Sequence, residues 1–317
     1  MKNIILICFL WLLASVSFAD QLIIEPDNGR APLLSAIQKA KSSIDLTLYG
    51  LTDKKLMDSL IDAKNHGKEV RILIEPAPYK NPKENNAAIK KLLAHHIFLQ
   101  SANPDFKLTH QKTFLIDHQS AIIMTFNLTK SAFNQERNFA LTINDPATIA
   151  EMMRVFSADL SHKKILVSNT HLVWSPDQAR EKITALIQQA QSNIKIYAPD
   201  ISDYQIIGEL AKKSRAGIKI EILTSANENI HPKKWVYLKK SGVIIHHSTQ
   251  YLIHAKVIII DQKRAMLGST NLTEPSLDQN RELSIITEDP DVIRQLTTTF
   301  DWDCPKNDGA RSKVFVN

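Results

Sequence analysis

Residues 110–117 read HQKTFLID, and residues 254–261 read HAKVIIID. Both stretches place a Lys two residues and an Asp seven residues after the His. Both are followed, seventeen residues after the His, by an Asn, which is Asn127 in the first copy and Asn271 in the second. A single pattern of this kind arises easily by chance, but two copies with identical internal spacing indicate a duplication. We therefore expect one catalytic site assembled from two related halves.

Each copy predicts a strand, a turn and a returning strand. Side chains two apart on a strand point to the same face, so His110 and Lys112 share a face. A turn at Asp117 returns the chain and brings Asn127 opposite His110. The second copy predicts the same grouping of an imidazole, an ammonium and a carboxamide, from His254, Lys256 and Asn271.

This set of groups suits a phosphodiester. A neutral imidazole can attack phosphorus and form a covalent phosphohistidine, and a second, protonated imidazole can give its proton to the leaving oxygen. Lys and Asn can neutralise and hydrogen-bond the non-bridging oxygens as charge builds on them. Each half supplies only one His of this kind, so the two halves must face each other.

Several of these residues also have a structural interpretation. A single His on a strand is more often a structural residue, and the repetition is what favours chemistry for His110 and His254. Asp117 and Asp261 occupy turn positions that favour Asp in any case, so shaping the turn stands beside catalysis as their role. The pairs at 95–96 and 246–247 lack a carboxylate or Cys at ligand spacing. We interpret them as loop histidines at the cleft mouth and predict no metal and no cofactor.

The duplication extends beyond the motif. Strand-like segments alternate with helical patterns in both halves, which indicates an α/β architecture in each. We predict a first lobe at 20–160, a polar linker at 161–173 and a second lobe at 174–317. The halves align at an offset of 150 before the His and of 144 after it. The second half is thus shorter by six residues just before its His, where substrate-specific variation is expected.

The first 19 residues are apolar after Lys2 and end in small residues, which predicts a signal peptide cleaved after Ala19; an uncleaved membrane anchor is the alternative. We therefore expect a secreted or periplasmic protein. Without this segment only Cys304 remains, which excludes an intramolecular disulfide. The net charge of +6 would fall to +5, which suits phospholipid or nucleic acid but is equally compatible with plain solubility.

The duplicated motif resembles the phospholipase D superfamily, whose signature is a paired HxKxxxxD followed by G-[ST]-x-N. The second copy, with Gly-Ser-Thr-Asn at 268–271, matches throughout. The resemblance implies two lobes related by a pseudo-two-fold axis, each a mixed β-sheet flanked by helices, with the site at their interface. It implies a metal-independent ping-pong reaction in which His110 is the nucleophile and His254 the general acid and then the base. The residues expected to bind the phosphate are Asn127, Asn271, Thr125 and Ser269.

The first copy departs from the family pattern. It has Met124 where Gly is expected, which we expect to narrow that side of the cleft. The family often has a Glu further on that orients the catalytic His, and Glu282 fits in the second half. Its aligned counterpart is Asn138, with Glu136 two residues earlier, and either is a candidate to orient His110. Because a carboxylate favours the imidazolium more than a carboxamide does, we hypothesise that the two histidines titrate differently.

Three functions remain open on the sequence. The preferred one is a secreted phospholipase D-type enzyme that hydrolyses or transphosphatidylates phospholipid headgroups. The alternatives are a secreted or periplasmic, metal-independent nuclease and a non-catalytic phosphate-binding module. A cardiolipin synthase is disfavoured, because such synthases usually carry N-terminal membrane spans. Apolar segments at 98–99 and 251–253 are candidates for transient membrane contact, and we expect a monomer.

Overall fold

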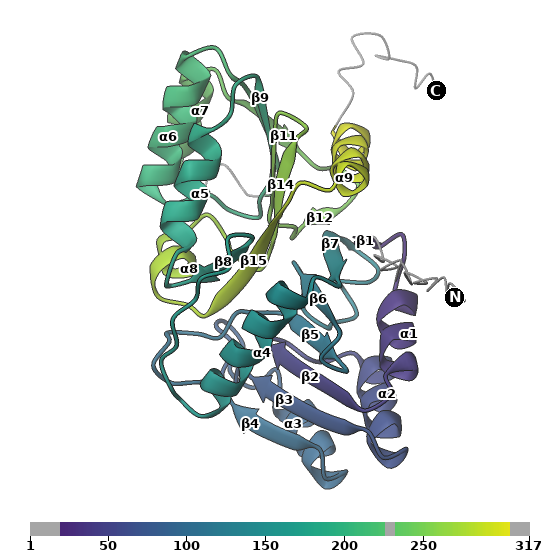
Figure 1. Ribbon diagram of the computed structural model, residues 1–317. Helices are drawn as coiled ribbons and strands as arrows, with labels where there is room; N and C mark the ends of the chain where they lie inside the picture. The colour runs from purple at the N-terminus through teal and green to yellow at the C-terminus, as the bar shows by residue number, and fades with distance from the viewer. Residues whose placement is uncertain (1–19, 226–231, 305–317) are drawn as a thin grey trace, which may run out of the picture.

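The computed structural model describes residues 20–225 and 232–304, which form two stacked lobes (Figure 1). In chain order the first lobe contains β1 (Gln21–Glu25), α1 (Ala31–Lys39), β2 (Ser43–Leu48), α2 (Lys54–Asn65), β3 (Glu69–Ile74), α3 (Asn86–Ala94), β4 (Phe98–Ser101), β5 (Thr113–Ile116), β6 (Ser120–Met124), β7 (Glu136–Ile143) and α4 (Pro146–Leu160). The second contains β8 (Leu172–Ser175), α5 (Ala179–Gln188), β9 (Asn193–Tyr197), α6 (Tyr204–Arg215), β10 (Lys219–Thr224), α7 (Pro232–Lys240), β11 (Ile244–His247), β12 (Leu252–Ile253), β13 (Val257–Ile260), β14 (Arg264–Gly268), α8 (Glu274–Asp278), β15 (Glu282–Thr287) and α9 (Pro290–Asp303).

The two lobes repeat one mixed sheet. The first has the strand order β1-β7-β6-β5-β2-β3-β4, and the second has the corresponding order β8-β15-β14-β13-β9-β10-β11. In each lobe the three strands at one edge are parallel, and the strands from β5 or β13 onward are antiparallel. Strand β12 of the second lobe pairs with β7 of the first. The predicted fold class, two α/β lobes with mixed sheets and helical flanks, is confirmed.

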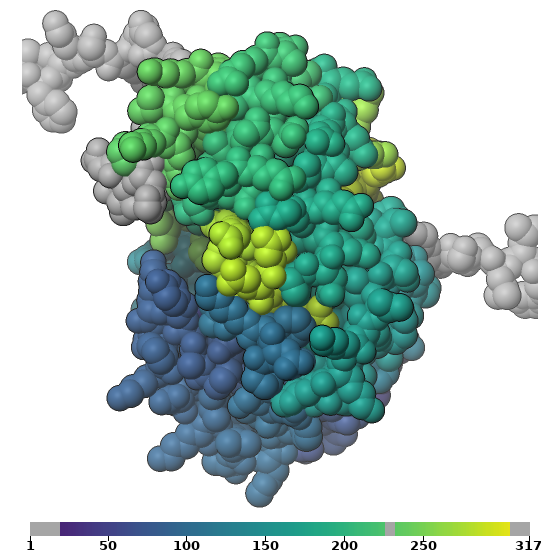
Figure 2. All heavy atoms as spheres, turned by 90° about the vertical axis from the view of Figure 1, so that its left-hand side faces the viewer, coloured from purple at the N-terminus to yellow at the C-terminus, as the bar shows by residue number. Residues whose placement is uncertain are grey.

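Three apolar clusters hold the layers together. One lies between β2, β3 and helices α1, α2 and α3, and a second lies between the other sheet and α5, α6 and α7. The third is shared: the inner faces of both sheets contribute to it, together with α4 and α9. Figure 2 shows the lobes in close contact, with α8 at their junction. Separating the lobes would expose this shared core to water, so their relative position is fixed by apolar burial.

The predicted linker, 161–173, runs two residues into β8 and is bound to the helix before it. The Glu151 carboxylate of α4 accepts hydrogen bonds from the backbone N–H groups of Ser168, at 2.8 Å, and Asn169, at 2.9 Å. It also accepts one from the indole of Trp174 at 3.0 Å. This segment is therefore held against α4 rather than acting as a free spacer.

The motif aspartates lie at the turns, away from the histidines. Asp117 follows the end of β5, whereas His110 precedes its start, and its φ of 53° places it in a turn of type I′. Its carboxylate accepts backbone N–H groups of Lys41 and Ser42 at 2.7 Å and of Ser43 at 3.0 Å. Asp261 repeats these bonds with residues 191–193. The predicted catalytic role of both aspartates is therefore wrong, and the turn-shaping alternative describes them.

These bonds make stability depend on pH. Burial opposes ionisation, but the N–H donors outweigh it and lower the pKa of Asp117 and of Asp261 to about 2. Each ionised carboxylate thus stabilises the fold above its unfolded pKa, and that stability is lost as pH falls through about 2. We expect Asp117→Asn and Asp261→Asn each to lower the free energy of unfolding at pH 7 by about 2 kcal/mol.

Urea unfolding between pH 7 and pH 2 checks this expectation, with the exposed Asp62→Asn as control. The double variant should lose less stability on acidification than the wild type. An unchanged acid dependence in the double variant would contradict the assignment.

Candidate active site

Each motif histidine is positioned by the opposite lobe. The backbone N–H of His110 donates to the carbonyl of Arg281 at 2.8 Å, and the N–H of Gln111 donates to the same oxygen at 3.1 Å. Reciprocally, the N–H groups of His254 and of residue 255 donate to the carbonyl of Arg137 at 3.3 and 3.0 Å. The two half-sites are therefore joined through main-chain bonds at the lobe interface, where the site was expected.

The side chains of the same two arginines anchor the lobes to each other. Arg137, on β7, forms a two-pronged ion pair with Asp303 of α9 at 2.7 and 2.9 Å. Arg281, on β15, forms the equivalent pair with Asp159 of α4 at 2.8 and 2.9 Å. Both guanidinium groups are almost fully buried. Each arginine also pairs with an aspartate of its own lobe, Asp27 and Asp177 respectively. We call these two arrangements the arginine clamps.

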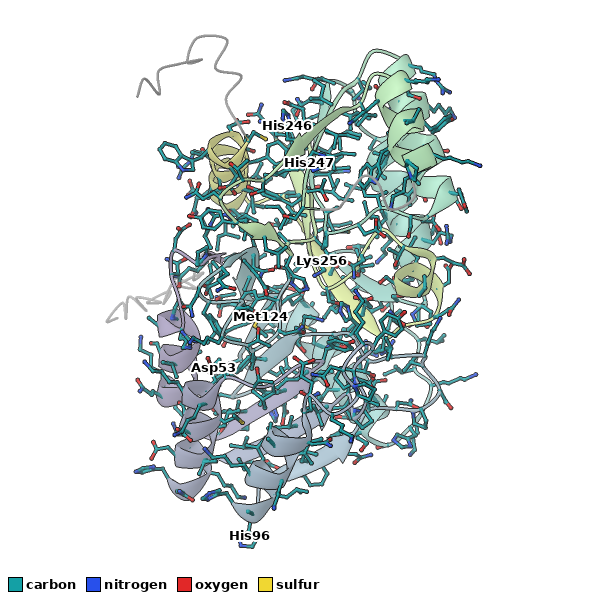
Figure 3. The ribbon with its side chains drawn as sticks, turned by 180° about the vertical axis from the view of Figure 1, so that it is seen from behind. Asp53, His96, Met124, His246, His247 and Lys256 are labelled. Carbon is teal, nitrogen blue, oxygen red and sulfur yellow. The ribbon has the colours of Figure 1, made fainter. Side chains whose placement is uncertain are left out.

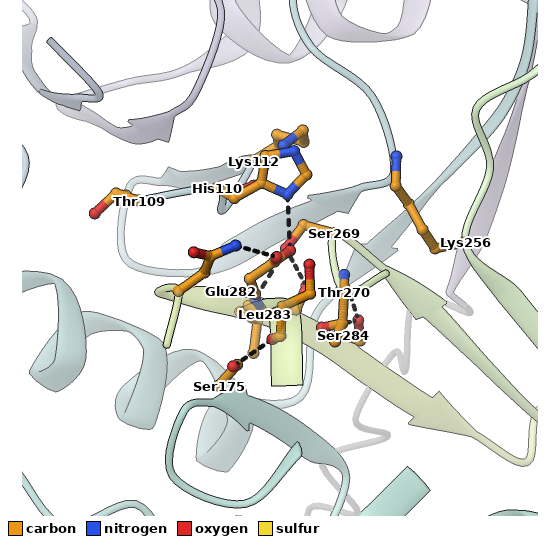
Figure 4. A network of polar contacts seen from close by, with 12 residues as sticks. Thr109, His110, Lys112, Ser175, Lys256, Ser269, Thr270, Glu282, Leu283 and Ser284 are labelled. Atoms are coloured by element: carbon orange, nitrogen blue, oxygen red, sulfur yellow. Dashed lines mark hydrogen bonds and ion pairs between the residues drawn. The ribbon is translucent and has the colours of Figure 1, made fainter. Parts of the chain in front are cut away.

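His110 contacts a carboxylate from the other lobe. Its Nδ1 lies 2.8 Å from the Oε2 of Glu282, a fully buried residue (Figure 4). Because a carboxylate accepts a hydrogen bond, this contact places the imidazole proton on Nδ1 and leaves the lone pair on Nε2. The ring of Tyr49 packs edge-on against the imidazole at 4.6 Å. The side chain of His110 keeps 13% of its surface exposed, and the Glu282 contact at Nδ1 does not engage its Nε2.

His254 contacts a carboxamide first and a carboxylate second. Its Nδ1 lies 3.3 Å from the Oδ1 of Asn138 and 3.6 Å from the Oε2 of Glu136. The Nδ2 of Asn138 donates to that carboxylate at 2.9 Å, which orients the amide with its oxygen toward the imidazole. His254 is therefore held by a weaker acceptor than the one that holds His110.

The orienting residues act across the interface, which the sequence assignment did not allow for. Glu282 was assigned to its own half, and Asn138 or Glu136 to His110. That assignment is wrong, because Glu282 contacts His110, and Asn138 and Glu136 contact His254. In the second lobe Asn280 donates to Glu282 at 3.3 Å, so each lobe carries one Asn–Glu pair, in opposite sequence order.

The two motif lysines lie beside the histidines and are buried. The Nζ of Lys112 donates to the carbonyl of His110 and lies 4.9 Å from the centre of the Tyr49 ring. The Nζ of Lys256 donates to the carbonyl of His254 at 2.6 Å and lies 3.1 Å from its Nε2. Both ammonium groups can therefore reach an anion bound between the histidines.

Burial determines the charge state of the site. It lowers the pKa of His110 to about 4, against the effect of Glu282 and with that of Lys112. Burial, and then the two lysines, hold the pKa of His254 well below its usual value. Burial also lowers the pKa of Lys256 to about 7 and, with Lys256 adding to it, holds that of Lys112 well below its usual value. At neutral pH both imidazoles are uncharged, as a nucleophile must be.

Two of the four predicted phosphate contacts are occupied inside the protein. The hydroxyl of Thr125 accepts the N–H of Phe139 at 2.9 Å and donates to Asn138 at 2.8 Å. Ser269 makes the corresponding bonds with the backbone of residue 283. Both hydroxyl side chains are fully buried, so the phosphate-binding prediction for them is wrong. Thr125 instead positions the amide that holds His254.

The predicted phosphate role of the two motif asparagines remains a prediction. Asn127 and Asn271 are half-buried. A Cβ at Gly50 would lie 3.2 Å from the Cγ of Asn127, and the Oδ1 of Asn127 is buried without a hydrogen-bond partner. The side chain of Asn127 is thus packed against the backbone at Gly50, and its amide oxygen lies in the interior.

Met124 lies in the core and not in the cleft. Its side chain is fully buried in the apolar cluster of the first lobe (Figure 3), so the expected narrowing of the cleft is wrong. The family glycine has a local reason in the second lobe. A Cβ at Gly268 would lie 2.4 Å from the carbonyl oxygen of residue 283. The cross-strand neighbour of Gly268 is Ser284, whereas the cross-strand neighbour of Met124 in the first lobe is the smaller Ala140.

The remaining histidine pairs lie away from the cleft. His95 ends α3, His96 lies at the outer tip of the first lobe, and His246 and His247 belong to β11 at a sheet edge (Figure 3). The predicted loop is confirmed for His95 and His96, which form the turn after α3, and is wrong for His246 and His247; the predicted place at the cleft mouth is wrong for His96. Across residues 20–225 and 232–304, no group of three or more His, Cys, Asp or Glu is arranged to hold a metal, and no helix is long and apolar enough to cross a membrane.

The arginine clamps are the part of the site that sequence reasoning missed. A signal was present: Arg137 and Arg281, and likewise Asp159 and Asp303, are separated by the same 144 residues as the motif histidines. Buried ion pairs with the period of a duplication indicate a contact that the duplication repeats.

The family model for "Cardiolipin synthase, PLD-like domain" matches residues 33–160 and 183–304. The chain belongs to this family. The predicted membership of the phospholipase D superfamily is thereby confirmed, and the protein is an enzyme of the phospholipase D phosphotransferase type. The two matched stretches are the two lobes that the structure places face to face.

Individual proteins agree with this assignment. A cardiolipin synthase of Oceanobacillus iheyensis is 24% identical over 89% of this chain and 68% of its own length. Among solved structures, a polyphosphate kinase from Porphyromonas gingivalis superposes with a TM-score of 0.72 at 17% identity, over 93% of this chain and 53% of that one. A phosphatidylserine synthase of Haemophilus influenzae Rd KW20 also reaches 0.72, at 11% identity, over 89% and 85%. At such identities the two structures establish the fold alone.

The relatives overturn two expectations. The predicted secreted or periplasmic location is wrong, because the curated relatives that this chain matches are cardiolipin synthases. Residues 1–19 and the cleavage site after Ala19, on which that prediction depended, lie outside the described residues. The argument that set cardiolipin synthases aside is overturned as well, because the chain belongs to their family.

The crossed contacts predict separate effects of the two orienting residues. Glu282→Gln should lower kcat roughly 10- to 100-fold, because His110 loses the partner that fixes its proton on Nδ1. It should also move the acid limb of kcat/KM to lower pH, since the carboxylate raises the pKa of His110. Asn138→Asp should leave that limb in place and raise the pKa of His254 instead.

Paired pH–rate profiles measure this, with Glu282→Asp as the conservative variant expected to recover part of the rate. If Asn138→Asp shifts the acid limb and Glu282→Gln does not, the crossed assignment is incorrect.

Proposed function

We propose that this enzyme transfers phosphatidyl groups: it breaks the headgroup phosphodiester of a phospholipid and passes the phosphatidyl group to an alcohol, or more slowly to water. The observation that carries the proposal is the contact between His110 and Glu282. It presents an uncharged imidazole with its Nε2 lone pair free, in a site where the other half supplies a second imidazole and each half supplies one lysine.

In the first step the Nε2 of His110 attacks phosphorus. A P–N bond forms, and the bond between phosphorus and the headgroup oxygen breaks. His254 takes up a proton when the anionic phosphodiester binds and gives that proton to the leaving oxygen, and Lys112 and Lys256 offset the charge on the non-bridging oxygens. Glu282 stabilises the positive charge that develops on His110.

In the second step an alcohol takes the place of the headgroup. The now neutral imidazole of His254 removes the proton from the hydroxyl, the hydroxyl oxygen attacks phosphorus, and the P–N bond breaks. His110 is released neutral and His254 is protonated again, so the site returns to its starting state. Water can enter in the same way and would yield phosphatidic acid.

A phospholipid substrate and an alcohol acceptor are supported by the relatives, whose printed names are those of synthases. The comparisons give no support to the nuclease alternative. The binding-module alternative is disfavoured by geometry, because both His–Lys pairs are complete and each His has an acceptor on Nδ1. Metal independence remains a prediction of the two-histidine chemistry.

The direct test uses phosphatidylglycerol vesicles in EDTA. We expect release of glycerol together with a lipid product of phosphatidyl transfer, in excess over phosphatidic acid, and an acid-labile phosphohistidine on quenching. His110→Ala should abolish both product and covalent intermediate, whereas His254→Ala should slow turnover about 10²- to 10⁴-fold. Single-stranded DNA serves as the competing substrate, and cleavage of DNA alone would refute the proposal.

The pH profile of kcat/KM should be bell-shaped. Below about pH 4 His110 becomes protonated and loses its lone pair, so activity falls. Above about pH 7 Lys256 loses its charge and no longer stabilises the phosphate, and His254 does not take up the proton that it must give, so activity falls again. Lys256→Arg keeps the cation at high pH and should move the alkaline limb upward.

Lys182→Arg is the matched control, because Lys182 is also partly buried, with its pKa lowered by burial, but bonds to backbone carbonyls outside the site. If the alkaline limb of Lys256→Arg stays at the wild-type pH, that limb belongs to a group other than Lys256.

A further inference from the structure

A groove opens on the second lobe between α6 and α7. It has a volume of about 750 Å³, and its lining includes Ile207, Gly208 and Tyr237, with Lys233 and Lys234 among the polar members. Both helices face the viewer in Figure 2. The volume is in the range of pockets that enclose small organic ligands. An apolar floor with basic residues beside it suits an amphiphile with an anionic head.

The groove adjoins the catalytic half-site. Strand β9 ends at Tyr197, whose cross-strand partner Val257 directly follows Lys256. The chain after β9 then reaches the groove residue Ser202, whose backbone N–H donates to the carbonyl of Leu272, the neighbour of Asn271, at 2.9 Å. The main chain that leaves the half-site at Lys256 therefore leads to the rim of the groove at Ser202.

Gly208 is the residue that leaves the groove open. It lies inside α6, where Gly is less favourable than any residue except Pro. A Cβ built on it meets no atom within 4 Å, so neighbouring protein groups do not require its small size. The missing side chain creates space without serving the packing of the helix.

The first lobe has an ion pair at the equivalent position. Helices α2 and α3 correspond to α6 and α7, and Asp58 corresponds to Gly208 at the offset of 150. Asp58 forms an ion pair with Lys91, which joins α2 to α3. Lys91 corresponds in turn to Tyr237 of the groove, by its place in the matching helix. One lobe thus has a polar bridge where the other has an open apolar channel.

The surroundings of the groove match the interface of an anionic bilayer. Tyr204 and Tyr237 are 88% and 42% exposed, and Val236 between the lysine pairs of α7 is 48% exposed. Helix α7 carries four lysines and no acidic residue. Lys234 pairs with Asp200, whereas Lys233 has no ion-pair partner in the described part of the chain. Exposed tyrosines beside lysines are suited to the boundary between lipid and water.

We propose that the groove between α6 and α7 binds an acyl chain of the phospholipid substrate, with Lys233 toward the anionic lipid surface. This proposal rests on the phosphatidyl-transfer function above and assigns that site its apolar subsite. It places recognition of the lipid tail in the second lobe alone.

The test compares a lipid with a soluble diester in the full-length protein. Gly208→Leu fills the groove, and Asp58→Leu places the same side chain at the equivalent position of the first lobe as the matched control. We expect Gly208→Leu to lower the ratio of kcat/KM for dioleoyl phosphatidylglycerol to that for bis(p-nitrophenyl) phosphate by about tenfold or more. Asp58→Leu should keep the wild-type ratio. The Tm of Gly208→Leu should not fall, since Leu favours a helix more than Gly does.

Binding gives a second measurement that needs no turnover. In a His110→Ala background, Gly208→Leu should raise the Kd of a fluorescent long-chain phosphatidylglycerol about tenfold, and Asp58→Leu should not. If wild type transfers phosphatidyl groups but Gly208→Leu has the wild-type ratio and Kd, the groove proposal is overturned while the proposed function stands. A loss of kcat/KM of equal size on the lipid and on the soluble diester also overturns the groove proposal. Failure of the wild type on every lipid refutes the proposed function itself.

Discussion

The two arginine clamps are the constraint on which the site depends. Each arginine offers its carbonyl to the main chain of the opposite histidine segment and its guanidinium to an aspartate of the opposite lobe. A shift of one lobe would break both sets of contacts at once. Because the arginines are buried, loss of Asp303 or Asp159 would leave each guanidinium with only its second, more exposed aspartate and would weaken the contact between the lobes. The clamps therefore fix the distance between the half-sites as firmly as the shared core does.

The two lobes differ in the order of the three residues around each clamp arginine. The first lobe reads Glu-Arg-Asn at 136–138 and the second reads Asn-Arg-Glu at 280–282. The central arginine builds the clamp in both. The outer positions decide which imidazole receives the buried carboxylate, and the crossing of the lobes gives it to His110. The composition of the two triplets is the same, so the difference between the Nδ1 acceptors of the two histidines arises from the order of the residues.

Local pattern was enough to predict the α/β lobes, the turns after the motif strands and the meeting of both His–Lys pairs. It could not reveal which residues cross the interface, because alignment of the halves pairs Glu282 with its own lobe. Spacing also suggested that Asp117 and Thr125 belong to the chemistry. The carboxylate of Asp117 and the hydroxyl of Thr125 instead accept hydrogen bonds from backbone N–H groups. The spacing of a motif is the same whether its residues contact substrate or stabilise a turn. Tertiary contacts, and not periodicity, separate these cases.

Binding of an anionic substrate also changes the protonation of the groups in the site. Two buried lysines beside two buried imidazoles lower one another's pKa, so the free site holds less positive charge than its residues could carry. A phosphodiester brings one negative charge into the same low-dielectric space and favours every protonated form there. His110, whose pKa burial lowers to about 4, stays neutral and keeps its Nε2 lone pair. His254 gains the proton that a general acid needs only when there is a leaving group to receive it, so the anion completes the catalyst that acts on it.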